Sequence, residues 1–88
     1  MTAVETRNKI LWNSLPHIIK NRIEEEANSN NMPYHKVYKI VFYKTIYPDI
    51  FYGIEDTMDK LKDLGYGVRV TKVNIDENEI DEKLIIEF

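Results

Sequence analysis

The clearest alternation of apolar and polar positions runs over residues 53–75, where a helical period gives way to a strand period. Four apolar residues, three or four positions apart, place one hydrophobic stripe on a helix: Ile54, Met58, Leu61 and Leu64. Gly65 follows the stripe and can adopt the left-handed conformation that ends a helix. After Gly67 the period falls to two, with Val68 and Val70 on one side. The segment predicts an amphipathic helix followed by a strand with one buried face.

The N-terminal part of the chain carries a second helical pattern, which a proline divides. Thr2 and Glu5 have the spacing of a capping box, so we expect a helix to begin at the second residue. Pro16 inside one long helix would cost about 3 kcal/mol, which favours two shorter helices. Ser14 is the expected N-cap of the second helix, and the polar residues after Ala27 are expected to end it.

Residues 34–47 are almost all β-branched, aromatic or lysine, a composition typical of a strand. We expect this strand over residues 37–44. The same residues also fit a helical stripe with Pro33 in its first turn, so a helix is the alternative. Pro48 and Asp49 then mark a turn, with Asp49 as a candidate cap of the helix that follows.

The end of the chain completes the order of elements. Residues 76–83 look too charged to be buried and are expected to form a connection. Residues 84–88 alternate as a strand, with Leu84, Ile86 and Phe88 on one face. We therefore predict one α+β domain over residues 1–88, in which an N-terminal helix or helix pair precedes a β-α-β-β unit. Its sheet has three strands, the last two antiparallel, and helices cover one face.

Composition limits what this chain can be. Its 88 residues suffice for one modest core, and no apolar run approaches the roughly 20 residues that a membrane span needs. The absence of cysteine excludes disulfides, thiolate metal ligands and a cysteine nucleophile in this chain. The first residues lack the apolar core of a secretory signal, so the expected location is the cytoplasm, without membrane attachment. The net charge of −3 predicts no general attraction to nucleic acid.

The sequence contains no spacing of residues that is typical of a catalytic or metal site. His17 and His35 are the only histidines, and neither lies near a glycine-rich turn around a serine. Residues 76–82 do not match a calcium loop, because Ile80 and Asp81 occupy positions that need an oxygen ligand and a glycine. The three glycines form no phosphate-binding loop. We therefore expect no enzyme activity, no metal and no cofactor.

Aromatic residues are more numerous than one small core is expected to hide, with six Tyr, three Phe and one Trp. Tyrosine is enriched in protein interfaces. Ile10, Leu11 and Trp12 are consecutive in a helix and point in three directions, so part of this apolar surface needs a partner. We predict a non-enzymatic protein-binding module that forms a homodimer anchored by Trp12. The candidate partner-binding residues are Leu11, Trp12, Ile19, Tyr47, Phe51 and Tyr52.

Residues 34–44 combine basic and aromatic side chains with no acid between them. Such a strand can stack bases and neutralise phosphates, so single-stranded nucleic-acid binding is the alternative function. Lysines on a solvent-facing strand, where they prevent edge-to-edge pairing, explain the same pattern and place this alternative second. Its candidate residues are Tyr34, Lys36, Tyr38, Lys39, Tyr43 and Lys44.

The order of elements also resembles a known layout. An N-terminal helix, a short strand, the run from Leu61 through Leu64, Gly65 and Tyr66 to Val68, and a closing apolar strand are similar to small phage-encoded accessory proteins of unknown role. The resemblance covers the chain from the first expected strand onward and assigns no functional residue. It implies a viral accessory or host-modulating protein that acts by binding in the host cytoplasm.

Overall fold

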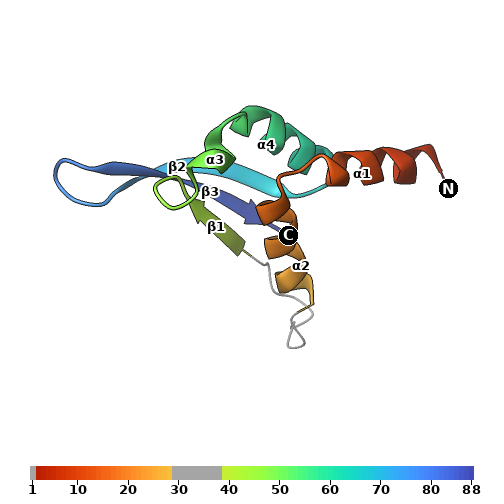
Figure 1. Ribbon diagram of the computed structural model, residues 1–88, viewed down its shortest axis with the longest axis horizontal. Coiled ribbons are helices and arrows are strands. Elements are labelled where there is room, and N and C mark those ends of the chain that lie inside the picture. Colours follow the sequence, from red (N-terminus) through yellow and green to blue (C-terminus); the bar gives the residue numbers. More distant parts are fainter. Residues whose placement is uncertain (1, 29–38) are drawn as a thin grey trace.

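The computed structural model describes residues 2–28 and 39–88, which form four helices and three strands. In chain order these are α1 (Ala3–Asn13), α2 (His17–Ala27), β1 (Lys39–Tyr43), α3 (Pro48–Phe51), α4 (Ile54–Asp63), β2 (Gly67–Asn74) and β3 (Ile80–Glu87) (Figure 1). The predicted α+β class is confirmed, and so is the order in which the three strands follow one another along the chain.

β3 is the central strand of the sheet, whose spatial order is β1-β3-β2, and it is antiparallel to both neighbours. β1 and β2 therefore run parallel to each other. The connection between them, through α3 and α4, crosses over β3, which lies between the two strands. Leu84 of β3 lies opposite Phe42 on one side and Val70 on the other. The predicted antiparallel pairing of the last two strands is confirmed, and β1 adds a second antiparallel pair.

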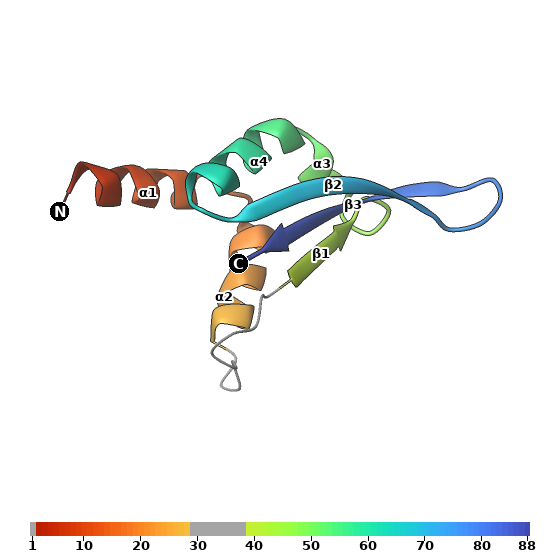
Figure 2. The same ribbon diagram turned by 180° about the vertical axis from the view of Figure 1, so that it is seen from behind.

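The core lies between one face of the sheet and the helices. Its buried residues come from α2 with the turn before it, from α3 and α4, and from β1 and β3: Leu15, Ile19, Ile23, Ile40, Phe42, Ile50, Leu61, Leu84 and Ile86. Side chains alternate along a strand, so the odd-numbered residues of β1 and β3 point to the opposite face. Figure 2 shows the strands from this side.

The molecule is elongated, with extents of 52 × 31 × 17 Å and a radius of gyration of 14.4 Å. A compact domain of this length would have a radius of gyration of about 12 Å. α1 projects from one end of the sheet and the β2–β3 hairpin from the other (Figure 1). These two projections carry surface that the central core does not cover.

The helix boundaries near Pro16 confirm one expectation and correct another. Thr2 is the N-cap of α1, as expected, and its Oγ1 accepts a hydrogen bond from the Glu5 backbone N–H at 3.2 Å. The expectation that Ser14 caps α2 is wrong, because Ser14 is the C-cap of α1 and its hydroxyl donates to the Leu11 carbonyl at 2.8 Å. Pro16 itself occupies the N-cap position of α2. The two expected helices form, but the serine belongs to the first of them.

The strand interpretation of the middle segment is confirmed by β1, while its helical alternative is not found; residues 37 and 38 of the expected strand lie outside the described part. The expected cap at Asp49 is wrong. Asp49 lies in the first turn of α3, a short helix that was not predicted, and the N-cap of α4 is Gly53 with a φ of 64°. Two glycine-dependent turns therefore bound α4, because Gly65 at its other end has a φ of 101°.

The charged connection before the last strand is shorter than expected. β3 begins at Ile80, and Asp81, expected to be exposed, is buried. Its side-chain oxygen accepts hydrogen bonds from the backbone N–H groups of Thr45 at 3.2 Å and Glu82 at 2.8 Å. A buried carboxylate is stable when such donors surround it, which the charge pattern along the chain could not indicate.

Candidate partner-binding surface

Two adjoining cavities lie where the turn after β1 meets the base of the β2–β3 hairpin. The larger has a volume of about 570 Å³ and is lined by Lys44, Thr45, Pro48, Lys72, Ile80, Asp81 and Glu82. The smaller has a volume of about 200 Å³ and is lined by Lys44, Pro48, Phe51 and Tyr52. Lys44 and Pro48 line both, so the two cavities adjoin, and we refer to them together as the hollow. We call these residues, together with Ile46, the turn–hairpin surface.

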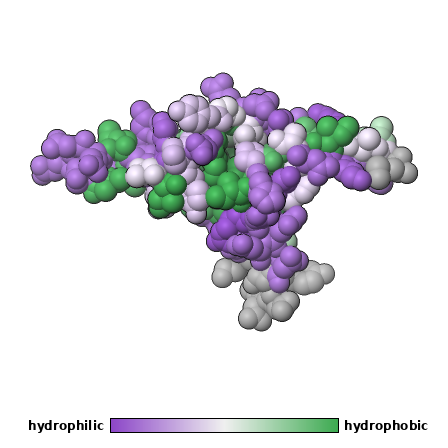
Figure 3. All heavy atoms as spheres, in the orientation of Figure 1, coloured by the Kyte–Doolittle hydropathy of each residue, from purple (hydrophilic) through white to green (hydrophobic). Residues whose placement is uncertain are grey.

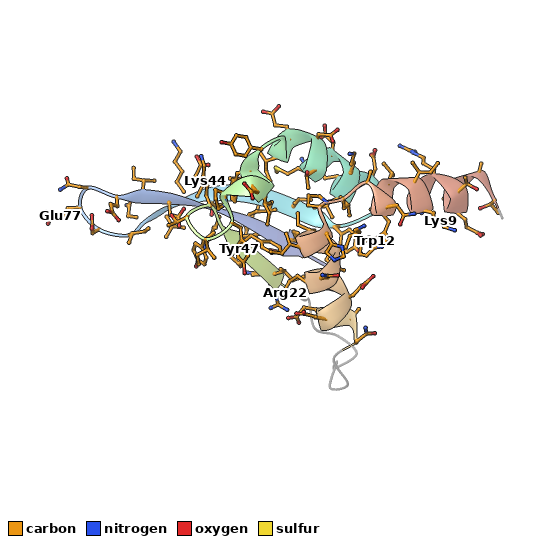
Figure 4. The ribbon with its side chains drawn as sticks, in the orientation of Figure 1. Lys9, Trp12, Arg22, Lys44, Tyr47 and Glu77 are labelled. Carbon is orange, nitrogen blue, oxygen red and sulfur yellow. The ribbon has the colours of Figure 1, made fainter. Side chains whose placement is uncertain are left out.

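Backbone hydrogen bonds hold the turn against β3. The Lys44 N–H donates to the Glu82 carbonyl at 2.8 Å, and the next N–H, of Thr45, donates to the Asp81 carboxylate. The chain then folds back, because the N–H groups of Ile46 and Tyr47 both donate to the Tyr43 carbonyl, at 3.1 and 2.8 Å. Figure 4 labels Lys44 and Tyr47 on this part of the chain. The turn is thus fixed in place before any partner arrives.

Exposed apolar side chains surround the hollow. Tyr52 is 81% exposed, Ile46 64% and Ile80 66%, although each is large and apolar. Single exposed apolar residues are ordinary, but a group of them around a hollow marks an interaction surface. Figure 3 shows apolar residues, in green, on the hairpin side of the molecule and on α1. The turn–hairpin surface therefore combines apolar contact area with a concave shape.

The charges of this surface are mixed. Lys44 Nζ lies 3.6 Å from Glu82 Oε2, an ion pair that partly neutralises both groups. Lys72 lines the same cavity and forms no ion pair with any residue in the part of the chain that the structure describes. A partner that approaches here would therefore meet an unpaired ammonium group beside apolar side chains.

Metal-ligating side chains do not gather in the hollow or elsewhere in the described part of the chain. Within residues 2–28 and 39–88, no three His, Cys, Asp or Glu side chains are placed to hold a metal ion. His17 is exposed on α2 and lines neither cavity. The same described residues include no helix long and apolar enough to cross a membrane. The turn–hairpin surface combines exposed apolar side chains with the charged groups of Lys44, Lys72 and Glu82.

The candidate residues in the crossover region differ in how accessible they are. Phe51 and Tyr52 line the smaller cavity. Tyr47 is half-buried and makes an edge-to-face contact with Phe42, with ring centroids 5.3 Å apart, so it supports the turn from within. The sequence interpretation missed Lys72 and Ile80, which come from the hairpin. Ile80 was detectable only as one apolar residue within a charged stretch.

The candidate residues in the N-terminal helices mostly serve the chain's own core. Ile19 is fully buried, so its side chain has no surface that a partner could contact. Trp12, the expected dimer anchor, is half-buried and packs against the core, and Leu11 is half-buried as well. Ile19 and Trp12 therefore serve the chain's own core, whereas Val4, Ile10 and Ile18 of these helices stay exposed, at 67%, 64% and 39%.

The basic and aromatic residues of the nucleic-acid alternative do not form one surface where the structure describes them. Tyr34, Lys36 and Tyr38 lie outside the described residues. Lys39 Nζ lies 3.9 Å from Glu87 Oε1, and Lys44 pairs with Glu82, so each of these lysines has a carboxylate beside it. Tyr43 is partly exposed on the sheet face that no helix covers, whereas Lys44 lines the hollow. These contacts weaken the alternative, and we do not propose it further.

Comparisons with models of protein families, with curated proteins and with solved structures find no match for this chain. No relative therefore contributes a residue role to this surface. The functional argument rests on the geometry of the turn–hairpin surface and on the physical chemistry of its residues.

Proposed function

We propose that this protein is a non-enzymatic protein-binding module whose partner docks on the turn–hairpin surface. The observation that carries the proposal is the position of Tyr52 and Ile80, two large and exposed side chains that line the two adjoining cavities. They come from the end of α3 and the first residue of β3, so only the folded chain brings them together.

Tyr52 has the properties of a binding anchor. Tyrosine is among the residues that dominate binding free energy at interfaces, since it combines a large ring with a hydroxyl that tolerates water. Its neighbours in the hollow belong to a turn that β3 holds by hydrogen bonds. A preorganised surface loses little conformational freedom when it binds, which favours affinity.

The charges of the hollow favour a partner segment that carries a carboxylate beside an apolar residue. Lys72 has no described ion-pair partner, and Lys44 shares its cavity. A carboxylate here would complete an ion pair while the apolar residue covers Ile80 or Tyr52. The resemblance of the sequence to small phage-encoded accessory proteins motivates the further proposal that this partner is a host protein in the cytoplasm.

The experiment compares capture of partners from a cell lysate by the wild-type chain, by Tyr52→Ala and by Val4→Ser. Val4 is a matched control, because it is an exposed apolar residue at the opposite end of the molecule. We expect the protein that wild type captures to bind Tyr52→Ala at least tenfold more weakly, which corresponds to about 1.4 kcal/mol. We expect Val4→Ser to bind it normally.

Thermal melting of each variant shows whether the fold is intact, because neither substitution removes a buried side chain. Equal affinity of Tyr52→Ala and wild type for the captured protein would remove the hollow as the docking site. Loss of binding in Val4→Ser alone would place the docking site on α1.

A further inference from the structure

β2 presents a long unpaired edge. It pairs with β3 on one side only, and no other strand in the part of the chain that the structure describes pairs with its outer side. The strand is eight residues long and contains no proline. Edges of this kind are templates for pairing with another strand unless charges, prolines or bulges prevent it.

The hydrogen bonds at the two ends of β3 show which backbone groups face the free edge. The Lys44 N–H donates to the Glu82 carbonyl, so even-numbered residues of β3 bond toward β1. Odd-numbered residues therefore bond toward β2, in agreement with the Ile75 N–H, which donates to the Glu79 carbonyl at 3.0 Å. Because bonding direction alternates along a strand, one set of β2 residues directs N–H and C=O groups outward. These are Val68, Val70, Lys72 and Asn74.

Thr71 stands in the middle of this edge with an unsatisfied hydroxyl. Its Oγ1 is buried and has no hydrogen-bond partner. Thr71 lies opposite Lys83 on the sheet face that no helix covers. A buried hydroxyl without a partner costs about the free energy of a lost hydrogen bond, so Thr71 is a point at which the single chain leaves a polar group unsatisfied.

We propose that β2 pairs with β2 of a second copy of this chain, antiparallel about a two-fold axis at Thr71, to form a continuous six-stranded sheet. Two copies of one strand can pair in this way because the arrangement is self-complementary. The outward-facing residues are every second residue of β2, and each has to lie opposite an outward-facing residue of the second copy. This condition is met only when the two-fold axis passes through a residue and not between two residues. The charges of β2 then restrict which residue that is.

Only a Thr71 axis places all four outward-facing residues of β2 opposite outward-facing residues of the second copy, without like charges directly opposite each other. An axis at Arg69 or at Lys72 would place like charges directly opposite, which is unfavourable. An axis at Val70 pairs Asn74 with a residue beyond the start of β2, and axes nearer the strand ends pair still fewer residues. The Thr71 axis places Val70 opposite Lys72 of the second copy and Arg69 opposite Val73. It also brings the two Thr71 side chains together, where threonine pairs form hydrogen bonds.

This dimer differs from the one expected at the N-terminal helices, because Trp12 packs against the chain's own core whereas the edge of β2 stays open. The dimer uses the edge of β2 and the proposed partner uses the turn–hairpin surface, and the two surfaces share Lys72. We therefore propose a homodimer as the sequence predicted, but at the edge of β2 and not at the N-terminal helices.

The first test measures the molar mass of the full chain by light scattering over a range of micromolar concentrations. We expect wild type and Lys72→Ala to approach twice the mass of one chain, and Lys72→Pro to remain a monomer. The two variants lose the same side chain, but only proline removes the outward N–H at the free edge. A wild-type chain that stays monomeric at high micromolar concentration would overturn the proposal.

The second test uses the register and does not depend on how Lys72→Pro folds. Glu at position 73 would face Arg69 of the second copy, whereas Arg would face a like charge. We expect Val73→Glu to tighten the dimer and Val73→Arg to weaken it, by about 2- to 30-fold each, because the contact occurs twice. Within one chain position 73 lies opposite Asp81, so the effects on melting should have the opposite sign. If neither Val73→Glu nor Val73→Arg changed the affinity of the dimer, the Thr71 axis would be wrong. Loss of the dimer in Ile10→Ser on α1 would also contradict it.

Discussion

α1 and α4 are helices of almost equal length, 11 and 10 residues, but they are held in different ways. α4 buries Thr57 and Leu61, whereas α1 buries no residue. α1 has a side-chain N-cap in Thr2, and α4 has none. The comparison shows that local signals suffice to place a helix in the sequence, while packing of an apolar face decides whether it contributes to global stability.

The ends of the two helices show the same difference. α4 stops through paired hydrogen bonds in which the Tyr66 and Gly65 N–H groups donate to the Leu61 and Lys62 carbonyls, at 3.0 and 2.9 Å. Tyr66 then contacts Phe88 edge-to-face, with centroids 5.6 Å apart. Besides the packing of Trp12 against the core, α1 is tied to α4 by an exposed ion pair, Arg7 Nη2 to Asp63 Oδ2 at 3.2 Å, and such pairs contribute about 0–1 kcal/mol. α4 is therefore part of the core and α1 is an arm attached to it.

The largest expected effect comes from shortening a buried side chain of α4. Leu61 is fully buried, so Leu61→Ala should lower the free energy of unfolding by about 2–5 kcal/mol. Ile10 of α1 is 64% exposed, and Ile10→Ala should change stability by no more than about 0.5 kcal/mol. Urea unfolding followed by circular dichroism measures both. Similar losses in the two variants would mean that α1 is packed as tightly as α4.

A smaller effect is expected at the end of α4. Gly65 has a φ of 101°, which a β-branched residue adopts only with strain, so Gly65→Val should cost about 1–3 kcal/mol. No atom lies within 4 Å of a Cβ built at this position, so the cost comes from the backbone and not from a clash. Gly67→Ala is the control, because Gly67 has no positive φ and a Cβ there meets Glu87 at ordinary contact distance. Melting of Gly65→Val at the wild-type temperature would show that the turn does not need glycine.

The smallest effect on global stability is expected at the cap of α1. Thr2→Ala removes the oxygen that accepts the Glu5 N–H, at a local cost of about 0.5–2 kcal/mol to the helix. Because α1 buries no residue, it should unwind without the rest of the domain. Hydrogen exchange should become faster in the α1 amides only, with an unchanged urea midpoint. A lower midpoint would show that α1 and the core unfold together.

Much of the fold was predictable from the sequence because its signals act over a few residues. The capping box at Thr2, the break at Pro16 and the helix stop at Gly65 each depend on neighbours within one or two turns of chain. Ser14 was misassigned because a serine between two helices can bond to either. Phe51 and Tyr52, which the sequence suggested as partner-binding residues, line the smaller cavity, but the hairpin residues Lys72 and Ile80 of the adjoining cavity come from far along the chain.

The sequence by itself predicted α1, α2, α4 and the three strands, and the core-facing side of β2 and β3, but not the short α3 or the start of β3 at Ile80. Only the tertiary structure decided that β3 lies in the centre, although the consecutive apolar residues Leu84, Ile85 and Ile86 are typical of a strand with neighbours on both sides. Ile85 is buried, and Val41 and Arg69 lie opposite it on the two neighbouring strands. A period of two specifies the face of a residue but not the neighbouring strand. Strand order, the buried Asp81, the hollow and the free edge of β2 depend on contacts between distant segments, and no local pattern encodes these.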